Sequence, residues 1–389
     1  MWWMLLMIVM VAAALFAVWF LSGRFSRFLP KSIRDKYGRV RSRLLGLIPV
    51  LPLIVYAILD PVNGVVVIVH VMLIWLIADG IGHLVRKLLN RSSKVGEEAT
   101  GEGKRGKPWW DRFYMAGACA VVFCVVYLSC GWYLAHHVSE TDYVFTTNKD
   151  IGVETIRIVQ ISDSHVGATF DGEGFADHMK TIQKVNPDVL VITGDYVDDD
   201  TSKEDMVRSC KALGELKTTY GVFFVYGNHD KGYFDYRDFS DADLRAELTK
   251  NGVKILEDTS VDITDGICLI GRKDRSENQR ADGTGRMEMS ELTAGLDKEK
   301  YNILLDHQPN DYDNEAASGV DLVLSGHTHG GQLIPIGWLG EWSGTNDNTY
   351  GLDTIGDTSF IVNSGISDWA IGYKTGTSSE FGVIDIKRG

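Results

Sequence analysis

Two histidines, His327 and His329, stand in the glycine-rich segment Ser325–Gln332. The apolar run Val320–Leu324 leads directly into this segment and is typical of a buried strand that ends in a turn. Each imidazole can offer a neutral nitrogen to a metal ion. A surface turn that contains two histidines by chance is the plain alternative, and the His-x-His pattern alone does not decide between the two interpretations.

Four further polar fragments follow apolar runs earlier in the chain. They are Asp163-Ser164-His165, Gly194-Asp195, Gly227-Asn228-His229-Asp230, and His307. Each fragment alone is a weak signal, because Asp, Asn and Gly are ordinary turn residues. Open α/β folds, however, place ligands at the carboxyl ends of their strands. Five such fragments with this Asp/His/Asn chemistry therefore predict one site for two metal ions.

Strands and helices alternate from residue 154 onward. Apolar runs typical of strands cover 155–162, 188–193 and 222–226, and helical patterns near 175–185, 203–216 and 242–251 lie between or after them. Further strand-like runs follow at 253–256, 267–271, 301–305, 321–324, 359–362 and 380–386. This alternation predicts sheets that are covered by helices.

Long apolar runs dominate the amino-terminal part of the chain, residues 1–135. Their lengths predict about four transmembrane helices, at 2–22, 44–60, 65–82 and 114–135. No basic segment precedes the first run, so we expect an uncleaved anchor rather than a signal peptide. Residues 136–153 are predicted to be a linker, and residues 154–389 to be the domain that carries the polar fragments.

Two basic segments, 24–43 and 86–112, contain every Lys and Arg of the amino-terminal part. The positive-inside rule places both segments in the cytoplasm. The amino terminus and the carboxyl domain are then expected outside, which makes the chain a multi-pass protein of the cell membrane with an extracytoplasmic domain. If the middle pair of spans forms only a re-entrant hairpin, the side of the carboxyl domain does not change.

The rest of the chain is acidic. Of the 39 Lys/Arg and 52 Asp/Glu in the chain, 16 and 7 lie in the amino-terminal part, so the remainder has a net charge of −22. Such a domain repels polyanions at long range, which argues against nucleic acid as the main partner. The five cysteines show no framework, and the sequence leaves open whether Cys210 and Cys268 form a disulfide.

Residues 154–386 resemble the calcineurin-like metallophosphoesterases. The continuation Gly330-Gly331-Gln332 after Gly326–His329 is similar to the membrane-anchored branch, which includes cell-envelope phosphodiesterases and the transmembrane protein with metallophosphoesterase domain. The resemblance implies an α/β (α+β) four-layer sandwich of two mixed β-sheets flanked by helices, here preceded by an N-terminal helical transmembrane region.

The resemblance also implies a set of metal ligands. One ion is expected on Asp163, His165 and His329, the other on Asn228, His307 and His327, and Asp195 is expected to bridge them. Mixed nitrogen and oxygen ligands suit Mn, Fe or Zn, and ligand type alone does not choose among these metals. Two divalent ions about 3.5–4 Å apart can lower the pKa of a bridging water and neutralise a phosphate.

His229 is next to the expected ligand Asn228, so it can face the leaving group as a general acid or as a positive stabiliser. Asp198 matches the family position that orients this histidine. An equally supported interpretation is that Asp198 is one more solvated acid in the run Asp198–Asp200.

Three positions depart from related patterns. Asp199 and Tyr226 stand where protein Ser/Thr phosphatases carry phosphate-binding arginines, which argues against protein phosphatase activity. Lys374 stands where an arginine is common in the membrane-anchored branch. Whether Lys374 contacts phosphate stays open at the level of sequence.

The sequence therefore predicts a membrane-anchored, dinuclear metal-dependent phosphoesterase. Its expected substrates are phosphodiesters or pyrophosphates of envelope lipids or wall precursors, hydrolysed by in-line attack of a metal-bridging hydroxide, and its partners are the lipid bilayer and this phosphate ester. Alternatives are a general phosphomonoesterase or a nucleotide phosphodiesterase. From another class, a metal-binding membrane sensor or scaffold with vestigial catalysis is possible, although an intact His229 beside a full ligand set disfavours it.

Overall fold

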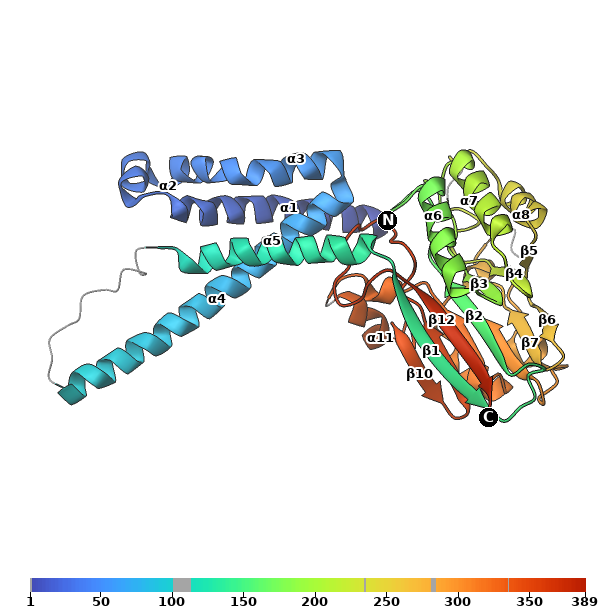
Figure 1. Ribbon diagram of the computed structural model, residues 1–389. Coiled ribbons are helices and arrows are strands. Elements are labelled where there is room, and N and C mark those ends of the chain that lie inside the picture. Colours follow the sequence, from blue (N-terminus) through green and yellow to red (C-terminus); the bar gives the residue numbers. More distant parts are fainter. Residues whose placement is uncertain (1, 101–112, 234–235, 281–284, 335) are drawn as a thin grey trace. The chain divides into compact units, whose positions relative to one another are not determined.

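The structure is a computed structural model that describes residues 2–100, 113–233, 236–280, 285–334 and 336–389 (Figure 1). The chain divides into two compact units, residues 1–130 and 131–389. The carboxyl-terminal part of the predicted basic segment 86–112, residues 101–112, lies outside the described residues.

The first unit is helical. Its helices are α1 (Trp2–Phe25), α2 (Lys31–Leu47), α3 (Leu51–Leu59), α4 (Pro61–Thr100) and most of α5 (Met115–His136). Within the described residues, four stretches are long and apolar enough to cross a membrane: Ile8–Phe28, Lys31–Leu59, Pro61–Leu89 and Met115–His136. Each stretch overlaps one of the four spans that the sequence predicts, so the apolar helices are present where we expected them.

One acidic side chain of α4 is held by polar partners within this unit. Asp79 lies 3.0 Å from the Arg24 guanidinium of α1 and accepts a 2.5 Å hydrogen bond from the Tyr114 hydroxyl. That hydroxyl in turn accepts a hydrogen bond from the indole nitrogen of Trp75. Because every member has a partner, this network links helices without leaving an uncompensated charge among apolar residues.

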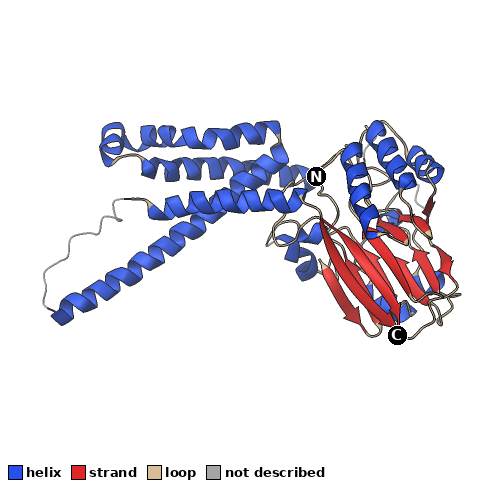
Figure 2. Cartoon of the chain, in the orientation of Figure 1, coloured by secondary structure: helices blue, strands red, loops and turns tan. Residues whose placement is uncertain are grey.

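The second unit contains two six-stranded mixed sheets (Figure 2). The first sheet has the order β1-β12-β2-β3-β4-β5 and consists of β1 (Ser139–Thr147), β12 (Glu380–Arg388), β2 (Thr155–Ile161), β3 (Val189–Thr193), β4 (Gly221–Val225) and β5 (Val253–Ile255). The second has the order β10-β11-β9-β8-β7-β6 and consists of β10 (Gly351–Ile355), β11 (Thr358–Val362), β9 (Leu322–Ser325), β8 (Tyr301–Leu305), β7 (Ile267–Gly271) and β6 (Thr259–Thr264).

The strands that precede the polar fragments are parallel to one another within each sheet. In the first sheet β2, β3, β4 and β5 are parallel, and in the second β7, β8, β9 and β11 are parallel. Antiparallel neighbours complete each sheet, with β12 against β2, β6 against β7, and β10 against β11. The carboxyl ends of the parallel strands therefore meet at one edge of each sheet.

Alternating side chains of each strand pack on opposite faces, which produces the layers. Ile156 and Ile158 of β2 join a core between the sheets, together with residues of β8 and β9 such as Ile303 and Leu322. Val159 and its neighbours on the other face pack under α6 (Gly172–Ile182), α7 (Lys203–Glu215) and α8 (Asp241–Lys250). Strands buried on both faces read as continuous apolar runs, as these do.

The second sheet is also covered on its outer face. Side chains of α9 (Met289–Leu292) and α10 (Tyr312–Ser318), including Met289 and Tyr312, pack on Ile270, Leu304 and Phe360. The order of layers is therefore helices, sheet, sheet, helices. This confirms the predicted fold class of two mixed sheets flanked by helices.

Residues 136–153, which the sequence predicts as a linker, contain strand β1. This strand pairs in parallel with β12 over nine residues, from Ser139 with Glu380 to Thr147 with Arg388. Its side chains alternate between half-buried and exposed, so it lacks the continuous apolar run of the central strands. Cys210 and Cys268 are both free thiols, so no disulfide joins them.

Candidate metal centre

The loops after β2, β3 and β4 carry the polar fragments of the first sheet. Asp163 and His165 follow β2, Asp195 follows β3, and Asn228 and His229 follow β4. Backbone hydrogen bonds connect these loops: the Asp163 amide donates to the Gly194 carbonyl and the His165 amide to the Asp195 carbonyl. Neighbouring parallel strands thus bring residues that are distant in the sequence to one edge.

The second sheet supplies the other histidines. His307 follows β8, and His327 and His329 follow β9. The Gly326 amide donates to the His307 carbonyl at 3.0 Å, so these two loops are also connected. The His327 amide donates to both carboxylate oxygens of Asp163 at 3.0 Å, which joins the loops of the two sheets.

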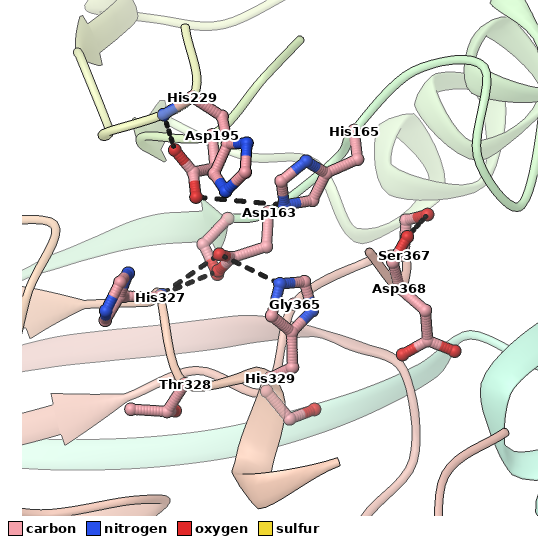
Figure 3. A network of polar contacts seen from close by, with 12 residues as sticks. Asp163, His165, Asp195, His229, His327, Thr328, His329, Gly365, Ser367 and Asp368 are labelled. Carbon is pink, nitrogen blue, oxygen red and sulfur yellow. Dashed lines mark hydrogen bonds and ion pairs between the residues drawn. The ribbon is translucent and has the colours of Figure 1, made fainter. Parts of the chain in front are cut away.

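These side chains form three groups within the described residues. Figure 3 shows Asp163, His165 and His329 of one group, with Asp195, His229 and His327 beside them. In each group the possible ligand atoms all lie within 4.8 Å of one another. The groups are Asp163, His165 and His329; Asp195, His307 and His327; and His165, Asp198 and His229. The first group contains the three residues predicted for one ion, and the second contains His307 and His327 of the other predicted set together with Asp195, the predicted bridge.

The Asp195 carboxylate lies between the groups. Its Oδ2 atom is 3.1 Å from His307 Nε2 and 3.8 Å from His165 Nε2. Its Oδ1 atom accepts a 2.8 Å hydrogen bond from the backbone amide of His229. One carboxylate therefore faces a histidine of each predicted ligand set while the chain holds its other oxygen in place.

Asn228 lies against the second group. Its side-chain oxygen is 3.2 Å from His307 Nε2, and its side-chain nitrogen donates to the Tyr233 hydroxyl at 2.8 Å. The tyrosine thus leaves the amide oxygen of Asn228 facing the same space as Asp195 and His307. An amide oxygen is a suitable metal ligand in a site with mixed nitrogen and oxygen donors.

Several of these residues adopt a backbone conformation that side chains other than glycine rarely take. Positive φ angles occur at Asp163 (50°), His165 (35°), Asp195 (50°), His327 (71°) and His329 (49°). Such conformations cost of order 1–3 kcal/mol each and cluster at functional sites. These conformations are concentrated on the loops after three strands. This supports a functional site, where the directions of the side chains are maintained at a cost in backbone energy.

Glycine is needed where two of these loops approach each other. A Cβ atom at Gly227 would lie 2.2 Å from Asp195 Oδ1, and a Cβ atom at Gly326 would lie 2.4 Å from Asp163 Oδ2. Both distances are too short for any side chain. The glycines beside Asn228 and His327 are therefore steric requirements of the site.

Asp198 is buried, with 6% of its surface exposed, and is not a solvated acid. Its carboxylate lies 3.3 Å from His165 Nδ1, and its backbone amide is held by the Thr201 hydroxyl at 2.9 Å. With His165 and His229 it forms the third group. The direct contact of Asp198 is thus with His165, where a carboxylate fixes the orientation of a ligating imidazole.

Asp230 belongs to the site, and our interpretation of the sequence missed its role. Its buried carboxylate accepts hydrogen bonds of 2.7–3.0 Å from the backbone amides of Asp195, Tyr196, Val197 and Gly227. It therefore ties the loop after β3 to the loop after β4. The signal was present as Gly-Asn-His-Asp, but turn residues of this kind are common.

The last loop of the domain also lies beside the site. Figure 3 shows Ser367 and Asp368 near Asp163 and His329. Lys374 is fully buried, and its ammonium lies 3.2 Å from Asp368 Oδ1 and donates to the Ser364 carbonyl at 2.7 Å. The lysine is therefore occupied in holding this loop, which argues against a direct role in gripping phosphate.

The protein environment splits the pKa values of the central histidines. Burial, and then the nearby His307, lowers the pKa of His327 to about 3. Burial, and then His165, lowers the pKa of His329 well below its usual value. Burial also disfavours the charged form of His307, but Asp195 outweighs it and raises the pKa of His307 well above the ordinary range. His327 and His329 are thus neutral at physiological pH, the form that binds metals.

Unsatisfied buried nitrogen atoms are a second reason, beside the neutral histidines, why these residues fit metal ions. The Nε2 atom of His165, whose Nδ1 faces Asp198, and the Nδ1 atom of His329 are buried without a hydrogen bond. An unsatisfied buried polar atom costs about 1–3 kcal/mol, so these atoms call for partners. Imidazole nitrogens together with carboxylate and amide oxygens are the donors that divalent transition metals accept.

Comparison with known proteins gives the same result. The family model of the calcineurin-like phosphoesterases matches residues 156–331. A metallophosphoesterase of Aquifex aeolicus is 33% identical over 198 residues, which cover 50% of this chain and 71% of that protein. One of Campylobacter jejuni is 32% identical over 237 residues, which cover 60% of this chain and 59% of that protein.

A bovine protein named transmembrane protein with metallophosphoesterase domain is 29% identical over 241 residues, covering 59% of this chain and 52% of that protein. The match to a solved dimetal phosphatase of Danio rerio covers 54% of this chain and 87% of that protein, with 13% sequence identity and a TM-score of 0.39. The family model and the Aquifex relative confirm the family predicted from the sequence. The chain belongs to the calcineurin-like metallophosphoesterases, a family of metal-dependent phosphoester hydrolases.

Proposed function

We propose that this chain is a membrane-anchored phosphoesterase that uses two divalent metal ions. Asp163, His165 and His329 hold one ion, Asn228, His307 and His327 hold the other, and Asp195 bridges them. The observation that carries this proposal is the placement of Asp195 Oδ2 between His307 Nε2, at 3.1 Å, and His165 Nε2, at 3.8 Å. A single carboxylate in this position is least costly when it faces two cations.

When bound, the two ions supply charge that neutralises a phosphate and activates water. The chain's own contribution includes His229. Its backbone amide is fixed by Asp195, and its ring contacts the rings of Tyr233 and Trp369 with centroids 5.0 and 5.1 Å away. These contacts hold the imidazole beside the ligand groups without making it part of the two ligand sets. His229 is therefore placed to donate a hydrogen bond or proton to the leaving oxygen.

The absence of arginine at Asp199 and Tyr226, and the commitment of Lys374 to Asp368, favour a substrate with one negative charge at phosphorus over a dianionic monoester. A phosphodiester has this property, and so does a pyrophosphate that is esterified at both ends. The apolar helices of the first unit support a substrate of the membrane or of the cell envelope. With both basic segments in the cytoplasm, the hydrolytic domain faces outward.

The test is a substrate panel on the full chain in detergent, after chelation and with Mn, Zn or Fe added back singly. We expect a bis-nitrophenyl phosphodiester to be hydrolysed faster than nitrophenyl phosphate, and chelation to abolish both activities. A preference for the monoester would instead support a phosphomonoesterase. Two bound metals with no turnover on any substrate would support a sensor or scaffold.

Asp195→Asn serves as the variant for the ligand assignment, because it removes the bridging charge and changes shape little. We expect loss of the paired metal site and of turnover. Asp200→Asn is the matched control, since Asp200 is an exposed acid of the same loop between β3 and α7. Two metals per chain by elemental analysis together with a near-normal rate in Asp195→Asn would refute the assignment.

A further inference from the structure

An exposed apolar surface begins five residues after His329, the second of the two histidines that follow β9. Ile334, Trp338, Leu339 and Trp342 expose 46%, 47%, 53% and 72% of their surfaces. The rings of Trp338 and Trp342 lie 6.0 Å apart, and Leu339 and Trp342 belong to the short helix α11 (Leu339–Ser343). We call these four residues the apolar surface. Large exposed apolar side chains concentrated in one short segment are candidates for a contact with a membrane or a partner.

The apolar surface is closely connected to the metal centre. Ile334 follows His329 by five residues, and the intervening turn is held by the hydrogen bonds from the Gln332 amide to the His329 carbonyl and from the Gly337 amide to the Leu333 carbonyl. The Thr349 hydroxyl also donates to the Gly337 carbonyl at 3.3 Å. The surface is therefore held in place relative to the ligand His329 by a short, hydrogen-bonded segment.

The same segment is bonded to the loop that precedes β12. The Thr375 amide donates to the Gln332 carbonyl at 2.8 Å, and the Ile334 amide donates to the Thr375 hydroxyl at 2.9 Å. The Gln332 side chain also donates to the carbonyls of Ile371 and Tyr373. The loop 371–375 is thus the direct neighbour of the apolar surface.

That loop and the residues after it contact the carboxyl end of α5, which belongs to the same compact unit. The Lys374 amide donates to the Gly131 carbonyl at 2.9 Å, and the Ser379 amide donates to the Leu134 carbonyl at 2.9 Å. The Ser379 hydroxyl donates to the Ala135 carbonyl at 2.8 Å. The end of the fourth candidate span is therefore connected to the apolar surface through one loop, which bonds Gly131 at Lys374 and Ile334 at Thr375.

Aromatic residues mark where this span leaves the bilayer. Trp132 and Tyr133 expose 53% and 54% of their surfaces, and their rings stack on His136 and His137 at 4.5 and 4.8 Å. Exposed Trp and Tyr at the end of an apolar helix are typical of the membrane–water interface. These residues indicate that the chain crosses the bilayer surface at residues 132–137. This stretch is next to the loop that is bonded to the apolar surface.

The charge pattern indicates which kind of lipid contact this is. Residues 301–373, which include the whole apolar surface, contain no Lys and no Arg. Attraction to anionic lipids requires basic residues near the membrane, so electrostatic recruitment is excluded for this segment. Apolar insertion by tryptophan and leucine side chains remains as the binding force.

We infer that the apolar surface formed by Ile334, Trp338, Leu339 and Trp342 lies in the interface of the bilayer and directs the metal centre to phosphoesters carried by lipids. The docking part of this inference stands on the contacts above, and the substrate part rests on the proposed function. Lipid-borne substrates then reach His327 and His329 along the membrane surface rather than from bulk solution.

Spin labelling of the full chain in nanodiscs of zwitterionic lipid tests the docking. Nitroxides are placed at Trp342→Cys and Leu339→Cys in a variant whose native cysteines are replaced by alanine, with Lys211→Cys of α7 as control. Lys211 and Trp342 are matched, since the Lys211 side chain is also 72% exposed. We expect collisions with oxygen to exceed collisions with a water-soluble nickel chelate at 339 and 342, and the reverse at 211.

Two outcomes overturn the docking. Labels at 339 and 342 that are as open to the nickel chelate as the control show a surface in water. Labels shielded from both oxygen and nickel show a protein contact, either a second copy or another chain. Replacing part of the lipid by anionic lipid is expected not to strengthen the docking, because the segment has no basic residues.

A kinetic measurement tests the substrate part in proteins with intact cysteines. We expect the double variant Trp338→Ser, Trp342→Ser to lose on the order of tenfold in kcat/KM on a phosphodiester lipid in the nanodisc and to keep its rate on a soluble nitrophenyl diester. Val144→Ser, an exposed apolar residue of β1, is the control. If the double variant loses activity equally on both substrates, the inference about lipid substrates is wrong. If the unmodified chain turns over neither substrate, the proposed function is wrong, and the labelling experiment alone decides whether the apolar surface docks on the bilayer.

Discussion

Asp195 and His229 are joined by a hydrogen bond, and the proposed function gives them different tasks at the candidate metal centre. The Asp195 carboxylate faces histidines of both ligand groups, while the His229 ring is fixed by Tyr233 and Trp369. His165, His229 and Asp198 also form a group that could hold an ion. A ligand and a proton donor therefore have to be separated by experiment, and leaving-group chemistry does this.

We predict that His229→Ala keeps both metals and loses ~10²–10⁴-fold in kcat, the usual effect of removing a general acid. The loss should shrink for a nitrophenyl ester, because its leaving oxygen needs little protonation. His327→Ala should behave differently, since it weakens metal binding and excess Mn²⁺ should restore part of its activity. The measurement is the rate of both variants on a series of esters whose leaving groups differ in pKa, with and without excess metal. If excess metal restores the activity of His229→Ala, then His229 is a metal ligand.

Asp230 acts at the same scale through the backbone. Its carboxylate accepts four amide hydrogen bonds, and an asparagine can accept only with its one oxygen. We predict that Asp230→Asn leaves buried amides unpaired and lowers the free energy of unfolding by about 3 kcal/mol. In a domain of this size that corresponds to a drop in Tm of roughly 6–12 °C.

Thermal unfolding of the full chain in detergent measures this change. Asp200→Asn is again the control, because Asp200 is exposed and nearby. The metal content of Asp230→Asn should fall as well, since the loops that carry Asp195 and Asn228 lose their connection. A melting temperature equal to that of the control would show that the four hydrogen bonds do not stabilise the site.

Strand β1 determines how the membrane span joins the hydrolytic domain. α5 ends at His136, and β1 begins at Ser139 and lies in parallel along β12. The connection is therefore a hydrogen-bonded edge strand rather than the linker that the composition predicted.

We predict that a soluble piece that begins at residue 149 is less stable than one that begins at residue 137. The shorter piece lacks β1, so β12 becomes an unprotected edge strand with buried side chains beside it. The expected decrease in Tm is about 5 °C or more, with greater aggregation. Thermal unfolding and light scattering of the two pieces give the comparison, and identical curves would mean that β1 adds nothing to the domain.

At the scale of the whole molecule, the proposed side of the membrane follows from charge. The two basic segments, 24–43 and 86–112, are proposed to be cytoplasmic, and an even number of spans places the acidic domain outside. Labelling with a membrane-impermeant maleimide in intact cells tests this proposal in variants with a single cysteine.

We predict that Lys211→Cys is labelled in intact cells and that Lys104→Cys is labelled only after permeabilisation. Lys211 lies in α7 of the hydrolytic domain, and Lys104 lies in the second basic segment. Fully permeabilised cells provide the control for reactivity. If both positions are labelled from the same side, the number of membrane spans between Lys104 and Lys211 must be even rather than one, which contradicts the proposed topology.

The sequence by itself indicated the chemistry of the candidate site, because each fragment of predicted ligands follows its own apolar run. Asp163, Asp195, His307 and His327 are recognisable from these local fragments, and the apolar lengths of the spans are equally local. Sheet pairing then brings the strand ends together in the structure. Physical rules of strand burial and strand-end binding sites suffice to find these fragments, whereas the assignment of each residue to one of two ions came from the family resemblance.

Only the tertiary structure decided the rest, because it depends on pairings that are distant in the sequence. Asp230 bonds residues 33 to 35 positions away, and β1 pairs with β12, the last strand of the chain. Asp198 contacts His165, and Lys374 is buried against Asp368, although both carry charges that a sequence assigns to solvent by default. Composition does not encode such partners, since a buried charge is stable only where a distant segment supplies its counterpart.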